Sequence, residues 1–256
     1  MPAPIKVLPE SLASQIAAGE VVERPALVVK ELIENSIDAG ATQIDVTLSR
    51  AGKDLIEVCD DGVGIPGDEL TLAVSSHATS KLNRPEDLFD IRTLGFRGEA
   101  LASIGSVARL TIRSRVAEAK TGFALVVDGG AMSELKPAAV AKGTCVTVND
   151  LFFNVPARLK FLKSEITENR QVSALVTRYA LAYPHLRWSL KQDNKTILQT
   201  TGSGSQEEVL QLLFGAQDVK QLIPVTFSEK GLAVNGYVSA ISLTRSNRKD
   251  ITLFIN

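Results

Sequence analysis

The stretch from Pro25 to Ala39 places its hydrophobic residues at helical spacing. A proline suits the first turn of a helix, and Gly40 follows the last periodic position, where a glycine commonly ends one. The apolar positions fall on one side of the helix, and Glu31, Asn35 and Asp38 fall on the other. The pattern therefore predicts an amphipathic helix whose polar stripe carries two carboxylates and an amide.

Alternating hydrophobic and polar residues follow this helix. Ile44, Val46 and Leu48 alternate with polar residues, and Leu55 to Cys59 forms a second strand-like run. The short Ala51-Gly52-Lys53 segment between the two runs predicts a hairpin. A long helical pattern runs from Pro156 toward Ala182. The remaining strand patterns lie at residues 108–113, 123–127, 145–148, 188–190 and 196–198. Together they predict an α+β fold in which helices accompany mainly antiparallel strands.

The small residues from Gly202 to Ser205 form the best linker candidate, because flexible residues there separate two regions with their own periodicity. We therefore expect a first domain at residues 1–201 and a second at 206–256. The second region shows a helical pattern at 207–214 and three strand patterns. The last of these, Ile251 to Ile255, runs into the end of the chain, so we expect a truncated second domain.

Composition narrows the class of protein. The chain has 256 residues, 45% of them hydrophobic, which is enough for a full core. Its 28 basic residues against 29 acidic ones give a net charge of -1, so any DNA contact must come from a local patch. The two cysteines, Cys59 and Cys145, lie in apolar strand patterns, and we expect reduced core residues there. Without a membrane-spanning or signal-peptide pattern, the expected protein is soluble and cytoplasmic.

Three glycine-containing segments suit a ligand that bears phosphates. Asp60 opens a D-x-G-x-G turn, in which glycines let the backbone approach a ligand closely. The loop from Gly95 to Gly98 leads into a helical stretch, and such loops direct backbone N–H groups at phosphate oxygens. The third segment, Gly143 to Val148, begins a strand. Each segment alone also fits an ordinary turn, helix entry or core strand, and the polar helix stripe alone fits a solvated surface.

The order of these segments resembles the GHKL ATPases, which include gyrase-type topoisomerases, heat-shock chaperones, histidine kinases and MutL. The sequences that carry this resemblance are ELIENSIDAG, DDGVGI, GFRGEAL and GTCVTV. QIAAGEVVERP, HATSK and NVPAR are similar to MutL-type DNA mismatch repair proteins in particular. The resemblance implies a two-layer α/β sandwich of the GHKL (Bergerat) type with a mainly antiparallel mixed sheet. Part of a second, ribosomal-protein-like α/β domain would follow.

The resemblance also implies residue roles around ATP and Mg²⁺. Glu31 matches the general base that orients or deprotonates the attacking water. Asn35 matches the residue whose amide oxygen reaches Mg²⁺. Asp60 matches the acceptor for the adenine amino group, and a guanine carbonyl there would be rejected. The other implied ATP-binding residues are Asp38, Gly64, Thr79, Lys81, the lid residues Gly95, Phe96, Arg97 and Gly98, and Thr144 beside the adenine.

In proteins of this family ATP acts as a conformational switch. The resemblance implies that ATP orders the lid and an N-terminal arm around Ile5 to Glu20, so that two N-terminal regions form a homodimer. Hydrolysis is expected to be slow even in an intact protein of this kind. It would be further impaired here, since the second-domain lysine that touches the γ-phosphate in MutL relatives would lie beyond Asn256. The implied partners are a mismatch-recognition protein, downstream repair factors and DNA. Weak, non-sequence-specific DNA contacts would involve Arg158, Lys160 and Lys163, or Arg245, Arg248 and Lys249.

Three alternatives remain at this point. The ATPase domain of a type II topoisomerase shares the nucleotide motifs, although the segment from Gln15 to Pro25 argues against it. A nucleotide-gated scaffold that barely turns over ATP is the second alternative. The third is an α+β domain that binds no nucleotide.

Overall fold

The computed structural model describes residues 6, 7, 9, 16, 18, 19, 21–82, 84–244 and 251–255. Its helices are α2 (Pro25–Asp38), α3 (Leu70–Ala73), α4 (Ala100–Val107), α5 (Pro156–Phe161), α6 (Glu165–Ala182), α7 (Gln206–Phe214) and α8 (Ala216–Val219). Short 3-10 turns are η1 (Arg50–Gly52), η2 (Gly67–Glu69) and η3 (Pro85–Phe89).

Most strands join one mixed sheet in the order β5-β4-β3-β7-β2-β1-β8-β9, with β6 paired to β4. The β1–β8 pair is parallel and the other pairs are antiparallel. The bounds are β1 (Gln43–Ser49), β2 (Leu55–Asp60), β3 (Arg109–Arg115), β4 (Gly122–Asp128), β5 (Ala131–Met132), β6 (Lys136–Ala138), β7 (Gly143–Asn149), β8 (Arg187–Gln192) and β9 (Lys195–Gln199). The predicted mainly antiparallel mixed sheet is confirmed.

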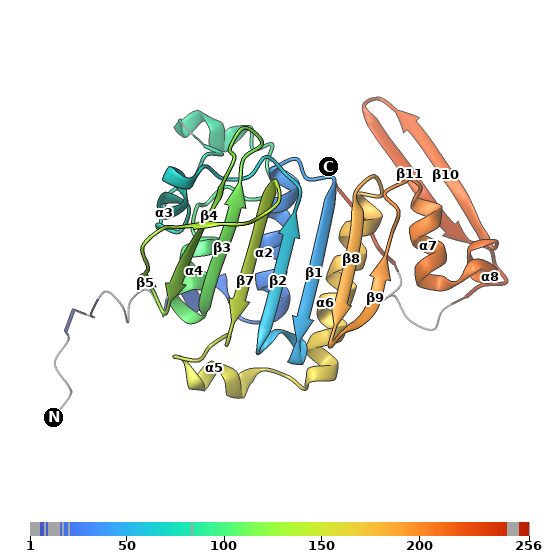
Figure 1. Ribbon diagram of the computed structural model, residues 1–256. Helices are drawn as coiled ribbons and strands as arrows, with labels where there is room; N and C mark the ends of the chain where they lie inside the picture. The colour runs from blue at the N-terminus through green and yellow to red at the C-terminus, as the bar shows by residue number, and fades with distance from the viewer. Residues whose placement is uncertain are drawn as a thin grey trace.

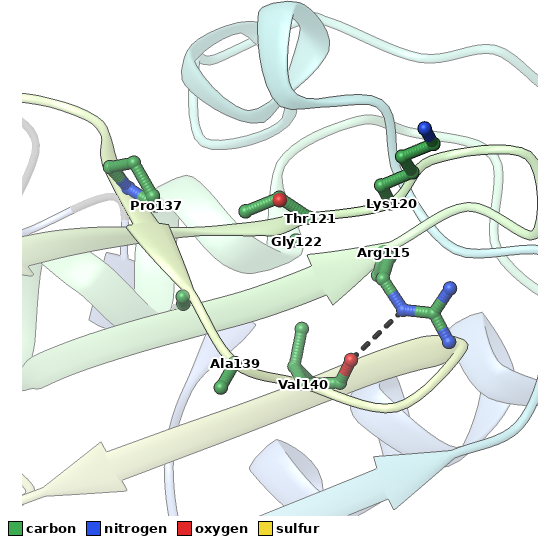
Figure 2. A pocket seen from close by; sticks show the side chains of 8 residues that line it. Arg115, Lys120, Thr121, Gly122, Pro137, Ala139 and Val140 are labelled. Carbon is green, nitrogen blue, oxygen red and sulfur yellow. Dashed lines mark hydrogen bonds between the residues drawn. The ribbon is translucent and has the colours of Figure 1, made fainter.

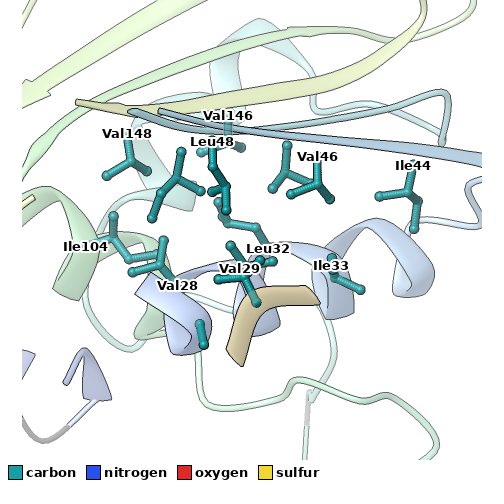
Figure 3. Close-up of a cluster of buried hydrophobic side chains, with 14 of the residues drawn as sticks. Val28, Val29, Leu32, Ile33, Ile44, Val46, Leu48, Ile104, Val146 and Val148 are labelled. Atoms are coloured by element: carbon teal, nitrogen blue, oxygen red, sulfur yellow. The ribbon is translucent and has the colours of Figure 1, made fainter. Parts of the chain in front are cut away.

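The sheet and its helices form two layers. Helices α2, α4 and α6 lie behind the sheet in Figure 1, and the other face carries no helix from the described part of the chain. Alternate side chains of β1 are buried, because every second residue points to the helical layer. Figure 3 shows α2 contributing Val28, Val29 and Leu32 to this core, opposite strand residues such as Val46. One buried face and one open face follow from this arrangement.

Helix α2 matches the predicted helix closely. It begins at Pro25 and ends at Asp38, one residue before the predicted end. The predicted helix from Pro156 toward Ala182, in contrast, is two helices. The backbone is extended at Leu162, and Ser164 then caps α6 by accepting a hydrogen bond from the backbone N–H of Thr167. A serine that satisfies a free N–H group favours a new helix start over continuation of the first.

The chain after residue 205 forms α7, α8 and the hairpin of β10 (Leu222–Glu229) and β11 (Leu232–Ser239). The helix predicted at 207–214 is confirmed as α7. The strand predicted from Ile251 to Ile255 is wrong: these residues are exposed and have no strand assignment. An apolar stretch becomes a strand only when another strand satisfies its backbone groups. The predicted domain boundary at 201–206 stays a prediction.

The expectation that the two cysteines are reduced is also wrong, whereas Cys145 is buried as expected. Cys59 and Cys145 face each other across β2 and β7 and form a disulfide. Sequence periodicity placed each of them in a strand, but it gave no information about which strand lies beside which. Within the described part of the chain, no helix has the length and apolar character needed to cross a membrane.

Candidate active site

The polar stripe of α2 binds the side-chain ammonium of Lys81. Lys81 places its Nζ 2.9 Å from Asn35 Oδ1 and 2.5 Å from Asp38 Oδ2. The lysine comes from the loop after α3, so the contact joins segments more than forty residues apart in the chain. Asn35 therefore presents its amide oxygen to a positive charge, the kind of ligand atom that a divalent cation takes from an amide side chain.

Asp38 also binds the backbone of the predicted lid. Its carboxylate accepts hydrogen bonds from the N–H groups of Leu94 at 2.9 Å and Gly95 at 3.1 Å. A Cβ atom at Gly95 would lie 3.1 Å from Lys81 Nζ and 3.6 Å from Asn35 Oδ1. The loop thus lies against the polar stripe, and a side chain at residue 95 would require the Lys81 ammonium to shift by a few tenths of an ångström.

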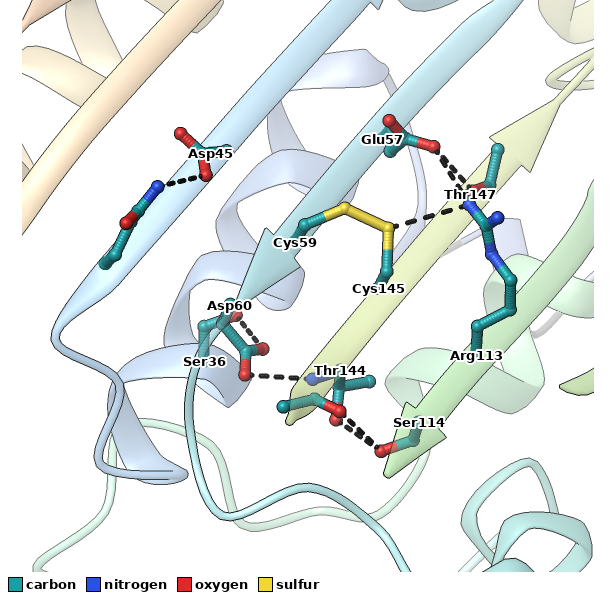
Figure 4. Close-up of a disulfide and its surroundings, with 12 residues drawn as sticks. Ser36, Asp45, Glu57, Cys59, Asp60, Arg113, Ser114, Thr144, Cys145 and Thr147 are labelled. Atoms are coloured by element: carbon teal, nitrogen blue, oxygen red, sulfur yellow. Dashed lines mark hydrogen bonds and ion pairs between the residues drawn. A yellow bond between two sulfur atoms is a disulfide. The ribbon is translucent and has the colours of Figure 1, made fainter. Parts of the chain in front are cut away.

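Asp60 lies at the end of β2 and is held by three donors (Figure 4). Ser36 Oγ donates to Oδ2 at 2.8 Å, and the backbone N–H groups of Gly62 and Thr144 donate to Oδ1 at 2.9 and 3.2 Å. Burial raises the pKa of the Asp60 carboxyl, and these hydrogen bonds oppose the rise only in part. Ser36 follows Asn35 directly on α2, so helix and hairpin meet at this carboxylate.

Thr144 is part of a second small network. Its hydroxyl lies 2.9 Å from the hydroxyl of buried Ser114, which donates to the carbonyl of Gly143 at 3.0 Å and accepts from the N–H of Ile65 at 2.7 Å. Gly64, beside Ile65, has a φ of 78° and packs against the carbonyl of Arg115. The sequence analysis missed Ser36 and Ser114, because a single serine at a helix or strand position carries no distinguishing pattern.

Glu31 is held by a different set of residues. Lys30 Nζ lies 3.1 Å from Glu31 Oε1 and 2.7 Å from Glu34 Oε2. The hydroxyl of Tyr179 on α6 donates to the other oxygen of buried Glu34 at 2.6 Å. Burial lowers the pKa of Lys30, but its bond to Glu34 and the charge of Glu31 outweigh this and raise it. Lys30 therefore keeps its charge. Through Glu34 and Tyr179 it also links Glu31 to α6.

The remaining lid residues make fewer contacts. Gly98 has a φ of 64° and packs against the backbone carbonyl of Ala78. Arg97 places its guanidinium 5.7 Å from the centre of the Phe96 ring. Thr79 accepts a hydrogen bond from the N–H of Lys81 at 3.1 Å. Lys81 and Gly95 thus lie together with Asn35 and Asp38. Phe96 and Arg97, at the tip of the lid, contact each other.

The site has little free space between Asn35 and Asp38, because Lys81 and Gly95 lie there. Two cavities, of about 520 Å³ and 400 Å³, are lined by residues other than Asn35, Asp38 and Lys81. Figure 2 shows the larger one, where Arg115 donates to the carbonyl of Val140. Glu31 has no hydrogen bond to Asn35 within the described part of the chain, so the two side chains would meet only through a ligand.

Solved structures are similar to this chain in fold and sequence. The MutL ATPase domain of Aquifex aeolicus, complexed with ADP, is 34% identical and aligns with a TM-score of 0.67, covering 86% of this chain and 78% of that one. This chain belongs to the MutL family. The N-terminal domain of a DNA repair protein aligns with a TM-score of 0.77 at 27% identity, covering 92% of this chain and 74% of that one.

Curated MutL proteins agree with this assignment. The DNA mismatch repair protein MutL of Staphylococcus carnosus is 47% identical over 252 residues, and that of Streptococcus pneumoniae serotype 19F is 49% identical over 249. Residues 23–144 match the family of histidine kinase-, DNA gyrase B- and HSP90-like ATPases. The chain spans 39% and 38% of the length of these two MutL proteins, so it corresponds to a part of them.

Proposed function

We propose that this MutL-family chain binds ATP with Mg²⁺ and hydrolyses it slowly, as the N-terminal module of a DNA mismatch repair protein. One observation carries the proposal: consecutive residues of α2 reach both halves of the site. Asn35 faces the Lys81 ammonium and the lid, while Ser36 donates a hydrogen bond to Asp60 beside Thr144. A nucleotide needs this pairing, because its base and its phosphates must be recognised together.

Asp60 suits the adenine end of such a ligand. A carboxylate offers about four acceptor positions, and Ser36, Gly62 and Thr144 use three of them. The fourth is left for an exocyclic amino group. Guanine would present a carbonyl at that place, and two facing acceptors would cost about 1 to 3 kcal/mol. We therefore expect selectivity for adenine.

Asn35 suits the phosphate end. Its amide oxygen already accepts from the Lys81 ammonium at 2.9 Å, so the position tolerates a cation. Mg²⁺ takes few protein ligands and completes its shell with phosphate oxygens and water, and when bound it neutralises phosphate charge. We propose that Lys81 then leaves Asn35 for the phosphates, while Gly95, Phe96, Arg97 and Gly98 close over them with backbone N–H donors.

Glu31 is the proposed general base. Lys30 holds the Glu31 carboxylate, with 3.1 Å between Lys30 Nζ and Glu31 Oε1. Both residues lie on the same helix as Asn35. From there the carboxylate would orient a water molecule toward the γ-phosphate and accept its proton. Catalysis of phosphoryl transfer depends largely on positioning and charge stabilisation, so a carboxylate fixed by Lys30, which also bonds to Glu34, is suited to the task.

At the level of the whole protein, we propose an ATP-gated dimerisation switch. ATP would order the lid and an N-terminal arm, whose residues lie largely outside those described, and so favour a homodimer that engages a mismatch-recognition protein and downstream repair factors. DNA would be a weak partner of this part. Arg158 is a poor candidate for that contact, because its guanidinium donates to the carbonyls of Gly19 and Val22. Arg245, Arg248 and Lys249 lie outside the described residues.

Nucleotide binding tests the proposal directly. Mg²⁺-ATP should raise the melting temperature of the wild-type chain, since a ligand that binds only the folded state stabilises it. Asn35→Ala should remove the Mg²⁺-dependent part of that rise. Asp60→Asn should reduce the preference for ATP over GTP. An equal Mg²⁺-dependent affinity in wild type and Asn35→Ala would refute the site assignment.

Single-turnover hydrolysis separates an ATPase from a nucleotide-gated scaffold. Glu31→Ala should lower the rate by about 10² to 10⁴-fold while ATP still binds, because the variant loses a general base and no binding contact. Equal rates in wild type and variant would refute a catalytic role for Glu31 and leave the scaffold as the better description. The DNA gyrase B-like motifs are shared with topoisomerases, but the MutL relatives favour a repair protein.

A further inference from the structure

The only two cysteines of the chain occupy one cross-strand pair on the open face of the sheet. Cys59 on β2 is directly opposite Cys145 on β7, with 4.0 Å between their Cα atoms. Val58, the neighbour of Cys59, is buried toward the helices, so the sulfur atoms lie on the face that no described helix covers (Figure 4). Cys145 is buried and Cys59 is half-buried, but neither belongs to the apolar cluster between the sheet and the helices, so the pair calls for another explanation.

Glu57 brings a third ligand atom to the same place. It lies two residues before Cys59 on β2, and alternate residues of a strand point to one face. One carboxylate oxygen of Glu57 and the two sulfur atoms all lie within 4.8 Å of one another. An i, i+2 pair on one strand and a facing residue on the next therefore converge on one point.

The contacts of Glu57 leave one of its oxygens free. Thr147 Oγ1 donates to Glu57 Oε2 at 3.0 Å, and Arg113 Nη2 lies 3.4 Å from the same oxygen. Oε1 has no hydrogen bond from any residue that the structure describes. Neighbouring donors that hold one carboxylate oxygen and leave the other for a metal are typical of ligand carboxylates.

We propose that reduced Cys59 and Cys145, together with Glu57, bind one zinc-type divalent cation. Two thiolates and a carboxylate form a ligand set that suits zinc, with water as the fourth ligand of a tetrahedron. The disulfide and the metal are alternatives, because both use the same two sulfur atoms. The site lies outside the proposed nucleotide contacts, although Cys59 and Cys145 adjoin Asp60 and Thr144 in the chain.

The charge of the surroundings fits this ligand set. Two thiolates and a carboxylate carry three negative charges, and a divalent cation leaves one of them uncompensated. Arg113 supplies the balancing positive charge, with Nη2 3.8 Å from Cys145 Sγ.

Reduction must come before binding. A water-soluble phosphine gives two electrons to the disulfide and becomes the phosphine oxide, taking its oxygen from water, whose two protons go to the thiols. Binding of the divalent cation then releases both thiol protons to the buffer. The oxidised protein should therefore bind no metal at this site, and it serves as an internal control.

Cobalt titration of the full 256-residue chain tests the site. Reduced, metal-free protein should bind one equivalent of Co²⁺ with a thiolate-to-cobalt charge-transfer band, and Zn²⁺ should displace it. Cys59→Ser should lose most of the band. Glu57→Gln should weaken binding by about tenfold or more. Asp45→Asn is the matched control, because Asp45 on β1 lies opposite Cys59 on the same open face but outside the cluster. The Asp45→Asn variant should bind Co²⁺ with the affinity of the wild type.

A second measurement needs no variant. Zn²⁺ should slow the alkylation of both thiols by iodoacetamide in the reduced wild-type chain. A reduced wild type that shows no charge-transfer band and no protection would overturn the proposal, and so would an unchanged affinity in Glu57→Gln. ATP binding, measured on the same samples by melting temperature, reports separately on the proposed nucleotide function, so failure of one leaves the other standing.

Discussion

Helix α2 has two faces that contribute to the protein in different ways. Its apolar face, with Val28, Val29 and Leu32, packs against the sheet and is almost fully buried (Figure 3). Its polar face carries Glu31 and Asn35, whose partners are Lys30 of the same helix and Lys81 of the loop after α3. The first face fixes where the helix lies. The second holds the groups to which we assign chemistry, and it depends on the first for its geometry.

The contrast teaches that stability and proposed function are separable along one helix. Burial of apolar area contributes several kilocalories per mole for each large side chain, whereas a partly exposed ion pair contributes about 0 to 1 kcal/mol. Substitutions on the apolar face should therefore act on folding. Substitutions on the polar face should act mainly on nucleotide chemistry.

The largest expected effect comes from Leu32→Ala. Leu32 is 2% exposed, and its removal should lower the free energy of unfolding by about 2 to 5 kcal/mol, measured by urea denaturation. Glu31→Ala, at the preceding position, is the matched control. Its side chain is 27% exposed and pairs only with Lys30 among the described residues, so the loss should stay below about 1 kcal/mol. Similar losses in both variants would erase the contrast between the faces.

Tyr179→Phe should have the next largest effect. The variant removes the only hydroxyl that donates to buried Glu34 from α6, and an acceptor left without its donor costs about 1 to 3 kcal/mol. The control is Tyr183→Phe, since the Tyr183 hydroxyl has no hydrogen bond within the described chain. Urea denaturation should show a clear loss only for Tyr179→Phe. Equal losses would mean that ring packing, and not the bond to Glu34, supports this part of α2.

Lys30→Met should change hydrolysis more than binding. Without the ammonium, the Glu31 carboxylate loses its fixed position, and we expect the single-turnover rate to fall by about tenfold at unchanged ATP affinity. Lys30→Arg should restore much of the rate, because it keeps the positive charge. A fall in affinity with an unchanged rate would show that Lys30 serves binding and does not position Glu31.

The smallest effect concerns pH. Burial raises the pKa of Asp60 above its ordinary value of 3.8, so the folded chain holds this proton more tightly than the unfolded chain. The stability that protonated Asp60 contributes is present below 3.8 and is lost as the pH rises through the folded value. Asp60→Asn should remove this downward slope from urea denaturation measured across that pH range. An unchanged slope would contradict the assignment.

Asp61 provides the opposite sign. Burial by itself would raise the pKa of its carboxyl, but several hydrogen bonds, among them those from Thr42 and Gln43, together outweigh this and lower the pKa. Stability from Asp61 is therefore present above its ordinary pKa and is lost as the pH falls through the folded value. Asp61→Asn should remove a slope opposite in sign to that of Asp60→Asn.

The local elements and the order of the motifs could be predicted from the amino-acid sequence alone. Periodicity located α2 to within one residue, because a helix of fourteen residues repeats its apolar pattern several times. It also placed β1 and β2 as a hairpin. The two polar residues of α2 that approach Lys81 were already on one stripe in the sequence, since helical spacing fixes which positions share a face.

Contacts between segments far apart in the chain could be found only from the three-dimensional structure. Cys59 opposite Cys145, Tyr179 on Glu34 and Ser36 on Asp60 each join residues whose contact no local spacing encodes. The same holds for Ile251 to Ile255, an apolar stretch that forms no strand among the residues that the structure describes. The physical reason is that local propensity acts within a few residues, whereas pairing and burial depend on the order of strands in the sheet and on which helix covers it.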